Sequence, residues 1–192
     1  HYAAALVMLA HWFPDNPFVD PVCGSGTIPI EAALYGHNIA PGINRSFISE
    51  QWVNLVPDGL SDEVRDEADA LANYDIELDI HGYDIDQNMI DIAQENSRAA
   101  GLTHDITFKQ LAVKDWQTSK VNGVIVANPP YGERLSDKES VHELYRQMGE
   151  LYRPLTTWSK YILTADMEFE KYYGTPATKR RKLYNGALRT DL

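Results

Sequence analysis

Short apolar runs alternate with amphipathic stretches along most of the chain. The apolar runs are too short for helices of the usual length, and their alternation or their β-branched residues predict strands. These runs cover residues 18–19, 78–83, 106–110, 121–127 and 161–165. The amphipathic stretches carry apolar positions at helical spacing and predict helices. They cover residues 3–12, 27–34, 61–73, 87–100 and 141–152.

Strands that alternate with helices predict an α/β fold, with a mostly parallel sheet and helices on both of its faces. The end of the chain departs from this alternation, because Asn185-Gly186 lies between two short runs in Leu183–Leu188. Asn-Gly is a strong signal for a two-residue hairpin turn. We therefore predict one antiparallel strand near the carboxyl terminus. A short helix is expected to begin near Glu168-Phe169.

Residues with special hydrogen-bonding or backbone properties mark the ends of two predicted helices. Thr27 can cap the helix at 27–34, and Asp86 can cap the helix at 87–100. Gly101 is expected just past the end of the second helix. One side of that helix carries Met89, Ile92, Ala93 and Asn96.

The composition is that of an ordinary globular protein, since 44% of the 192 residues are hydrophobic. This length suits a single α/β domain over residues 1–192. No window resembles a signal peptide, and no apolar run is long enough to span a membrane. Cys23 is the single cysteine. A lone cysteine excludes a disulfide framework and a cysteine-rich zinc site, and it predicts a cytoplasmic, reducing environment.

The charge of the chain is acidic and unevenly distributed. The formal net charge is -11 and the pI is near 4.9, which argues against unaided binding to nucleic acid. Asp62–Asp91 is strongly acidic, with Arg65 as its single basic residue, whereas Lys179–Lys182 is a compact basic cluster. Both segments are also typical of solvated faces. A local basic cluster can nevertheless contact a phosphate while the bulk of the protein is acidic.

A glycine-containing loop, Asp20-Pro21-Val22-Cys23-Gly24-Ser25-Gly26-Thr27, follows the first predicted strand and leads into a helix. This succession can cradle a nucleotide-like ligand, because Gly24 and Gly26 let the backbone approach the ligand closely. Pro29 takes the place of the third glycine of the dinucleotide-binding pattern, and Asp20 would repel a diphosphate. The combination favours a ligand with an amino-acid part or a positive charge.

Later acidic residues extend this candidate site. Asp84 follows the second predicted strand, where α/β folds bind ribose hydroxyls, and Ile85 is expected to pack on an adenine face. Asp115 lies just beyond the third predicted strand and can accept a hydrogen bond from the adenine amino group. Asp115 and Trp116 can also be a capping carboxylate and a core tryptophan, so both interpretations remain open.

The segment Asn128-Pro129-Pro130-Tyr131 follows the buried run at 121–127. Open α/β sheets bind ligands at the carboxyl ends of their strands. The Asn128 side-chain oxygen and the Pro129 carbonyl can accept hydrogen bonds from an exocyclic amino group, and prolines hold such acceptors in place. Tyr131 offers a ring on which a base can stack. Asn-Pro also marks ordinary tight turns, so the segment alone does not decide between the two interpretations.

Three motifs occur in the order found in class I S-adenosylmethionine-dependent methyltransferases, which the chain resembles over essentially its whole length. They are Asp20–Thr27, Gly82-Tyr83-Asp84-Ile85-Asp86 and Asn128-Pro129-Pro130-Tyr131-Gly132. Two further motifs resemble bacterial ribosomal-RNA guanine-N2 methyltransferases of the large-subunit K/L type, also labelled predicted N6-adenine-specific DNA methylases (the UPF0020 family). These are Pro41-Gly42-Ile43-Asn44-Arg45 and Lys182-Leu183-Tyr184-Asn185-Gly186.

The resemblance implies a Rossmann-like fold whose seven-stranded sheet ends in an antiparallel strand. It implies S-adenosylmethionine as cofactor and S-adenosylhomocysteine as product, with RNA as the partner and DNA as the alternative. Family members carry an amino-terminal RNA-binding THUMP domain, so we expect such a domain upstream of this chain. Neither a metal nor a covalent nucleophile is expected to be needed, and the oligomeric state stays open.

The resemblance also suggests roles for individual residues. Gly24 and Gly26 would border the methionine part of the cofactor, and Asp20 would favour its ammonium group. Asp84 would hold the ribose, and Asp115 the adenine amino group. The remaining cofactor candidates are Pro21, Cys23, Ser25, Thr27 and Ile85, and the catalytic candidates are Asn128, Pro129, Pro130 and Tyr131.

Three alternatives remain from the sequence. An N6-adenine-specific DNA methyltransferase needs the same acceptors for its target amine. A nucleotide-dependent oxidoreductase is disfavoured by Pro29 in the glycine loop and by the Asn-Pro-Pro-Tyr segment. A non-catalytic RNA-binding module could keep the fold without the reaction. Cys23 lies in the cofactor loop, which disfavours it as a nucleophile.

Overall fold

The computed structural model describes residues 2–37, 76–130, 135–178, 180–184 and 187–191. The predicted helix at 61–73, the Pro41–Arg45 motif and Tyr131 lie outside the described residues. So do Lys179 and the hairpin turn residues Asn185-Gly186.

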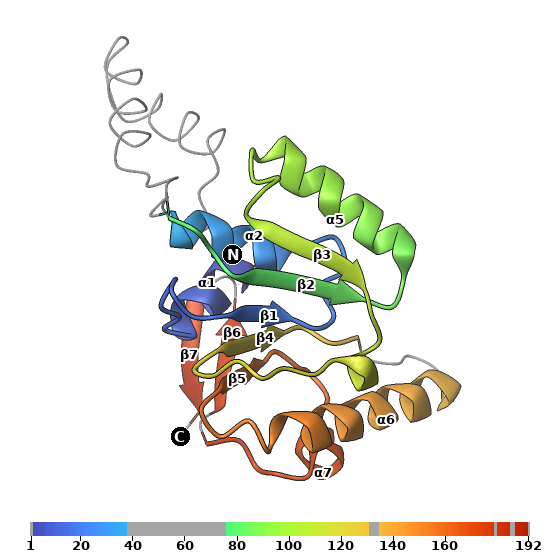
Figure 1. Ribbon diagram of the computed structural model, residues 1–192. Helices are drawn as coiled ribbons and strands as arrows, with labels where there is room; N and C mark the ends of the chain where they lie inside the picture. Colours follow the sequence, from blue (N-terminus) through green and yellow to red (C-terminus); the bar gives the residue numbers. More distant parts are fainter. Residues whose placement is uncertain (1, 38–75, 131–134, 179, 185–186, 192) are drawn as a thin grey trace.

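A five-stranded parallel sheet forms the centre of the domain (Figure 1), with the strand order β3-β2-β1-β4-β5. Each strand lies at or close to an apolar run of the sequence. The strands are β1 (Phe18–Asp20), β2 (Ile80–Asp84), β3 (Ile106–Gln110), β4 (Val124–Ala127) and β5 (Ser159–Ile162). In register, Phe18 of β1 pairs with Ile80 on one side and Val124 on the other. The predicted α/β fold with a parallel sheet is therefore confirmed.

Helices cover both faces of the sheet, as predicted (Figure 1). One face packs against α1 (Tyr2–Leu9), α2 (Thr27–Gly36) and α5 (Gln87–Ala99). The other packs against η1 (Val113–Asp115), α6 (Leu135–Tyr152) and α7 (Phe169–Tyr173). Side chains alternate between the two cores along a strand: Phe18 belongs to the first and Val19 to the second. Such two-sided burial explains why β1 and β4, which are buried throughout, follow continuous apolar sequence.

The sheet differs from the expected one at its carboxyl-terminal end. Among the described residues, β6 (Arg180–Tyr184) and β7 (Ala187–Asp191) pair with each other in antiparallel fashion and form a separate two-stranded sheet. The antiparallel hairpin is confirmed, but the expectation of one seven-stranded sheet is wrong. The turn signal specifies only the pairing of the two strands next to it, in which Tyr184 lies opposite Ala187. Joining the main sheet would require pairing along its edge, which no local signal specifies.

The ends of α2 and α5 test the predicted caps. Thr27 is the first residue of α2, and the capping position belongs to Gly26, which has a φ of 87° and no side chain. The prediction that Thr27 is the cap is therefore wrong. Asp86 does cap α5, since its side chain accepts a hydrogen bond from the Asn88 N–H at 2.8 Å. Gly101, with a φ of 75°, follows the end of α5 as expected.

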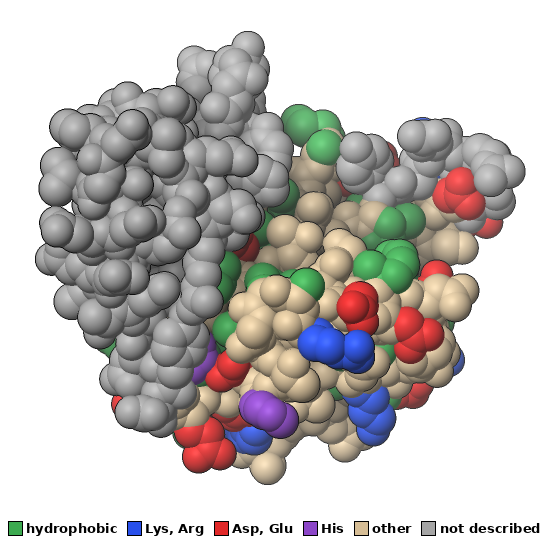
Figure 2. Space-filling view, turned by 90° about the horizontal axis from the view of Figure 1, so that it is seen from above, with side chains coloured by type: hydrophobic (Ala, Val, Ile, Leu, Met, Phe, Trp, Pro, Cys, Tyr) green, Lys and Arg blue, Asp and Glu red, His purple; other side chains and the backbone are tan. Residues whose placement is uncertain are grey.

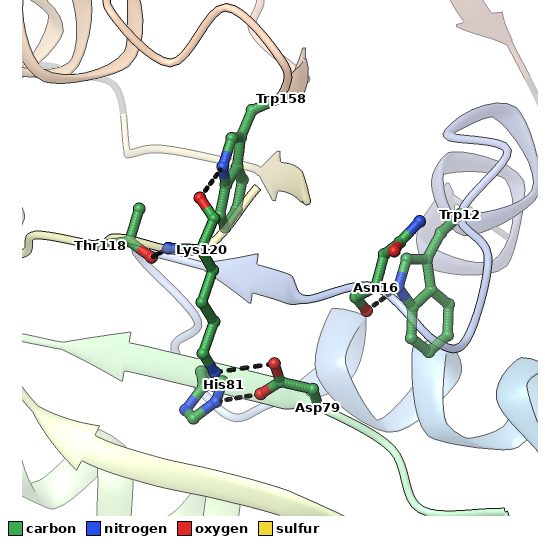
Figure 3. A network of polar contacts seen from close by, with 7 residues as sticks. All are labelled: Trp12, Asn16, Asp79, His81, Thr118, Lys120 and Trp158. Carbon is green, nitrogen blue, oxygen red and sulfur yellow. Dashed lines mark hydrogen bonds and ion pairs between the residues drawn. The ribbon is translucent and has the colours of Figure 1, made fainter. Parts of the chain in front are cut away.

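A polar network joins the loops at the amino ends of three strands (Figure 3). Asp79 bonds to His81 Nε2 at 2.6 Å and accepts from Lys120 Nζ at 2.8 Å. Burial alone would raise the pKa of Asp79, but the hydrogen bonds and charges of Lys120 and His81 outweigh it and lower that pKa. The Lys120 carbonyl accepts from Trp158 Nε1 at 2.9 Å. The network ties together the approaches to β2, β4 and β5.

Candidate active site

The carboxyl ends of the parallel strands meet at one edge of the sheet and bring the predicted residues together. Asp20 ends β1, which lies between β2 and β4. Asp84 ends β2, and Asn128 directly follows β4. The carboxyl edge therefore holds three polar side chains from segments far apart in the sequence, in the place where open α/β sheets bind ligands.

The glycine loop is fastened to the end of β2 by Asp84. Its Oδ2 accepts a hydrogen bond from the Gly24 N–H at 2.9 Å, and its Oδ1 accepts from the Asp86 N–H at 2.9 Å. The Cys23 N–H adds a bond to the Tyr83 carbonyl at 2.8 Å. Sequence reasoning assigned Asp84 to a ribose and missed this contact with the loop. Asp84 holds the loop in place, and its carboxylate has lone pairs left for a ligand.

The two glycines of the loop serve different purposes. Gly24 has a φ of 52°, and a Cβ built on it would meet nothing within 4 Å. Gly26 has a φ of 87°, and its Cβ would lie 3.0 Å from both Ala93 Cβ and Phe108 Cζ. Gly24 therefore faces open space that a ligand can fill. Gly26 is required by packing against α5 and β3, which corrects the expectation that both glycines serve close approach to a ligand.

Side chains of α5 and α2 also support the loop. Asn96 of α5 donates from Nδ2 to the Ser25 carbonyl at 3.0 Å. The hydroxyls of Ser25 and Thr27 lie 3.4 Å apart, and Pro21 is buried. The sequence places Asn96 on the same side of its helix as Met89, Ile92 and Ala93 and does not assign this role to it. Polar residues on the side of a helix that faces a glycine loop are the signal that could have indicated it.

Asp20 is a buried carboxyl group, with only 1% of the residue exposed. It accepts a hydrogen bond from the Val22 N–H at 3.1 Å. Burial raises the pKa of Asp20 to about 8, the Val22 bond lowers it, and the nearby Asp84 charge raises it further. A buried carboxyl group with so high a pKa gains from a cationic partner. The site therefore suits the ammonium group predicted for its ligand.

Cys23 is buried, and burial raises the pKa of its thiol, as do the charges of Asp20 and Asp84. Its Sγ donates a weak hydrogen bond to the Gly24 carbonyl at 3.5 Å. Because the thiolate is the nucleophilic form, this environment argues against a nucleophilic role, in agreement with the sequence analysis.

The adenine side of the predicted site is open. Ile85, just past β2, is 71% exposed. Gln110 at the end of β3 donates a hydrogen bond from Nε2 to the Ile85 carbonyl at 3.0 Å. Asp115 is exposed in η1. Trp116 is buried and packs edge-on against Tyr152 and Trp158, so it is a core tryptophan. Ile85 and Asp115 lie free for a ligand at this edge, and their roles stay predictions.

The turn after β4 presents Asn128 to solvent. Asn128 and Pro130 are exposed, whereas Pro129 is buried between them. The preceding strand is buried throughout, so the start of the turn is anchored in the core. The Tyr145 hydroxyl of α6 approaches the Pro130 carbonyl at 3.4 Å. The Asn128 side chain is thus exposed at the same edge of the sheet as the glycine loop, and the roles of the Pro129 carbonyl and of Tyr131 stay predictions.

A histidine and two carboxylates come together beyond β5. His142 Nε2 lies 3.4 Å from Asp166 Oδ2 and 3.7 Å from Glu168 Oε2. These ligand atoms all lie within 4.8 Å of one another, so the group could hold a metal ion. The sequence alone gives no local ligand pattern here, because His142 lies in α6 and the two carboxylates lie beyond β5. Direct contacts between His142 and the two carboxylates account for the same arrangement.

The surface seen from above mixes both signs of charge (Figure 2). Lysine and arginine side chains of the described residues are separated there by acidic and uncharged ones, without a continuous basic patch on this face. Over the parts of the chain that the structure describes, no helix has the length and apolar character needed to cross a membrane.

The whole chain, residues 1–192, matches the UPF0020 family, described as the RMKL-like methyltransferase domain. The chain belongs to this family. With the glycine loop, Asp84 and the Asn128 turn at one edge of the sheet, this membership confirms the resemblance seen in the sequence. A methyltransferase domain also disfavours the oxidoreductase alternative.

Named relatives agree with this membership. A Bacillus subtilis protein named "Putative RNA methyltransferase YpsC" is 56% identical over 189 residues, which cover 98% of this chain and 49% of that protein. A "Ribosomal RNA large subunit methyltransferase K/L" of Syntrophotalea carbinolica is 38% identical over 205 residues, covering 99% of this chain and 28% of that protein. The chain thus spans about half or less of the length of these relatives.

Solved structures share the fold of this RMKL-like domain. A predicted N6-adenine-specific DNA methylase from Listeria monocytogenes has a TM-score of 0.86 and 54% identity, with 98% of this chain and 49% of that chain covered. SMU.472, solved in complex with SAH, has a TM-score of 0.85 and 51% identity, with 98% of this chain and 51% of that chain covered.

Proposed function

We propose that this chain is the catalytic domain of an S-adenosylmethionine-dependent methyltransferase that acts on guanine N2 of large-subunit ribosomal RNA. The observation that carries the proposal is the exposed Asn128 on its proline turn, at the same edge of the sheet as the glycine loop and Asp84. The RNA target rests on the names of the relatives. The label of the Listeria relative supports adenine N6 in DNA as the alternative.

The residues at the carboxyl edge fit this cofactor. Asp20 is a buried carboxyl group suited to the ammonium of its methionine part, and open space lies beside Gly24. Asp84, Ile85 and Asp115 are available for the ribose and adenine, and SMU.472 was solved in complex with SAH. When bound, the cofactor supplies an electrophilic methyl group. The protein itself binds and orients both partners.

The turn would activate the target amine. The lone pair of an exocyclic amine is delocalised into the base, which makes the nitrogen a poor nucleophile. The Asn128 side-chain oxygen and the Pro129 carbonyl accept its two N–H groups and favour a tetrahedral nitrogen whose lone pair is free. With the cofactor bound, Asn128 and Pro129 would hold the amine nitrogen toward the methyl group that the cofactor supplies, and the proton displaced from the nitrogen would pass to solvent. Positioning supplies most of the rate.

Selection of the RNA would belong largely to other parts of the protein. On the face drawn in Figure 2, the described residues form no continuous basic patch, and the relatives extend well beyond the matched region. We therefore propose that an upstream THUMP-type domain supplies most phosphate contacts and that this domain supplies the chemistry. The same proposal places the reaction in the cytoplasm.

Two alanine variants separate the roles of the turn and the loop. Asn128→Ala should lower methyl transfer by at least about a hundredfold, because an acceptor for the amine is lost, and should leave cofactor affinity within about twofold. Asp84→Ala should weaken cofactor binding about tenfold or more, because it removes a ligand group and releases Gly24. Titration with S-adenosylhomocysteine and single-turnover methyl transfer measure the two effects.

Full turnover by Asn128→Ala would refute the activation of the amine by the turn. If that variant instead lost cofactor binding, and excess cofactor restored methyl transfer, Asn128 would be a cofactor-binding residue. Asn128→Asp provides a matched control, because it keeps the size and an acceptor oxygen while it changes the charge.

A further inference from the structure

The Tyr145 hydroxyl of α6 contacts the Asn128 turn. It donates a hydrogen bond to the Pro130 carbonyl at 3.4 Å. This bond joins the middle of α6 to the turn after β4.

Two prolines limit how neighbouring side chains can bind the described part of the turn, residues 128–130. Pro129 and Pro130 have no backbone N–H, so neighbouring acceptors cannot bind them there. A donor to the Pro130 carbonyl can still fix this part of the turn. Tyr145 supplies that donor. The 3.4 Å separation is long for an O–H···O bond.

The position of the Tyr145 ring is itself fixed. Tyr145 is completely buried in the core formed with α7. Its ring meets Phe169 edge-on, with centroids 4.7 Å apart and an interplanar angle of 68°. Burial raises the pKa of Tyr145, so its hydroxyl keeps the proton that it donates. A rigid ring with a protonated hydroxyl is suited to holding a turn in one conformation.

We infer that Tyr145 is a positioning residue for methyl transfer, which acts through its hydrogen bond to the Pro130 carbonyl. Tyr145 sets the orientation of the proline turn and thereby the aim of the Asn128 and Pro129 acceptors. This inference rests on the proposed role of that turn. It assigns the hydroxyl of a core aromatic residue to the reaction, where helical spacing alone indicates only packing.

Tyr152 offers a matched control on the same helix. Its side chain is also fully buried in the same core. In the described part of the chain, however, its buried hydroxyl oxygen has no hydrogen-bond partner. Removing a hydroxyl without a partner should cost little or even stabilise the fold. Tyr145→Phe and Tyr152→Phe therefore make the same chemical change in the same core and differ in the bond to the turn.

The test uses the full-length gene product with S-adenosylmethionine and unmodified ribosomal RNA. We expect Tyr145→Phe to lower kcat by about tenfold to a hundredfold while the KM for the cofactor stays within about twofold, because misaimed acceptors slow only the chemical step. Tyr152→Phe should keep kcat within about twofold. Thermal unfolding of both variants checks that a difference in turnover does not follow from a difference in stability.

The 13C resonance of the Pro130 carbonyl gives a readout that does not depend on turnover. It should shift in Tyr145→Phe and stay in place in Tyr152→Phe. An unmoved resonance, or turnover of Tyr145→Phe equal to wild type, would overturn the inference. If the resonance shifts as expected but wild-type protein transfers no methyl group, the hydrogen bond stands and the proposed function fails instead.

Discussion

Asp20 carries the most distinctive chemistry at the scale of single residues. Its pKa of about 8 means that the ligand-free protein holds a proton on this carboxyl group at pH 7. Binding of an ammonium group favours the ionised carboxylate. We therefore expect cofactor binding at pH 7 to release a proton. Calorimetric titration with S-adenosylhomocysteine in two buffers of different ionisation enthalpy measures this release.

Asp20→Asn is the matched control for that release. The variant keeps the shape of the side chain but cannot ionise. Its heat of cofactor binding should therefore depend less on the buffer than that of the wild type, because the proton from Asp20 is no longer released. Equal proton release by wild type and Asp20→Asn would rule out Asp20 as the group that titrates. The variant should also bind the cofactor more weakly, because the charge that faces the ammonium is missing.

The same group affects stability with pH. The ordinary pKa of the Asp20 carboxyl is 3.8, against about 8 in the fold. Between these values the folded protein holds a proton that the unfolded chain has lost, so this group lowers the free energy of unfolding as pH rises from about 4 to 8. Asp20→Asn should therefore gain thermal stability over the wild type at pH 8 and much less at pH 5.

Individual residues also show where prediction from sequence ends. Asp20, Asp84 and Asn128 could be placed at one edge, because each follows an apolar run that reads as a parallel strand. The bond from the Gly24 N–H to Asp84 joins residues 60 positions apart. This bond depends on the path of the loop, which cannot be predicted from the sequence pattern. The link between Tyr145 and Pro130 likewise depends on how α6 lies against the turn.

At the scale of elements, the glycine loop predicts different outcomes for its two glycines. Gly26→Ala should lower the free energy of unfolding by about 2 kcal/mol or more, because it adds a left-handed backbone penalty to an overpacked contact with Ala93 and Phe108. Gly24→Ala should cost about 1 kcal/mol through the backbone alone. Its main effect should be weaker cofactor binding, since the new methyl group enters the open space.

Urea unfolding and titration with S-adenosylhomocysteine separate these two outcomes. Gly26→Ala should keep its cofactor affinity at temperatures where it remains folded. A Gly26→Ala protein as stable as wild type would show that α5 can move away, which would contradict the packing argument. Unchanged cofactor affinity in Gly24→Ala would place the ligand away from the loop.

The helix α5 shows that element prediction can succeed in extent without deciding which side of a helix is buried. Its predicted range, 87–100, agrees with Gln87–Ala99. The buried residues are Ile90, Ala93 and Ser97, whereas Ile92 is 43% exposed. The sequence has apolar residues on two sides of this helix. Which side is buried depends on how the helix packs against the sheet. The small size of Ser97 and its bond to the Leu102 carbonyl suit the buried side.

At the scale of the whole molecule, the parallel sheet and its two helical layers followed from the alternation of strands and helices. The separate β6-β7 hairpin did not, because its pairing partner is a long-range choice. The site assignment depended on motif order, since composition and net charge alone argued against a nucleic-acid partner. That conflict is resolved if RNA selection belongs to another part of the protein, as the greater length of the relatives supports.

The central claim is methyl transfer to guanine N2 of ribosomal RNA. The most direct test incubates the full-length gene product with labelled S-adenosylmethionine and, in parallel, unmodified ribosomal RNA and unmethylated genomic DNA. Digestion and mass spectrometry then identify the methylated nucleoside. The account predicts N2-methylguanosine from the RNA and no label in the DNA. N6-methyldeoxyadenosine from the DNA alone, or no label in either nucleic acid, would contradict it.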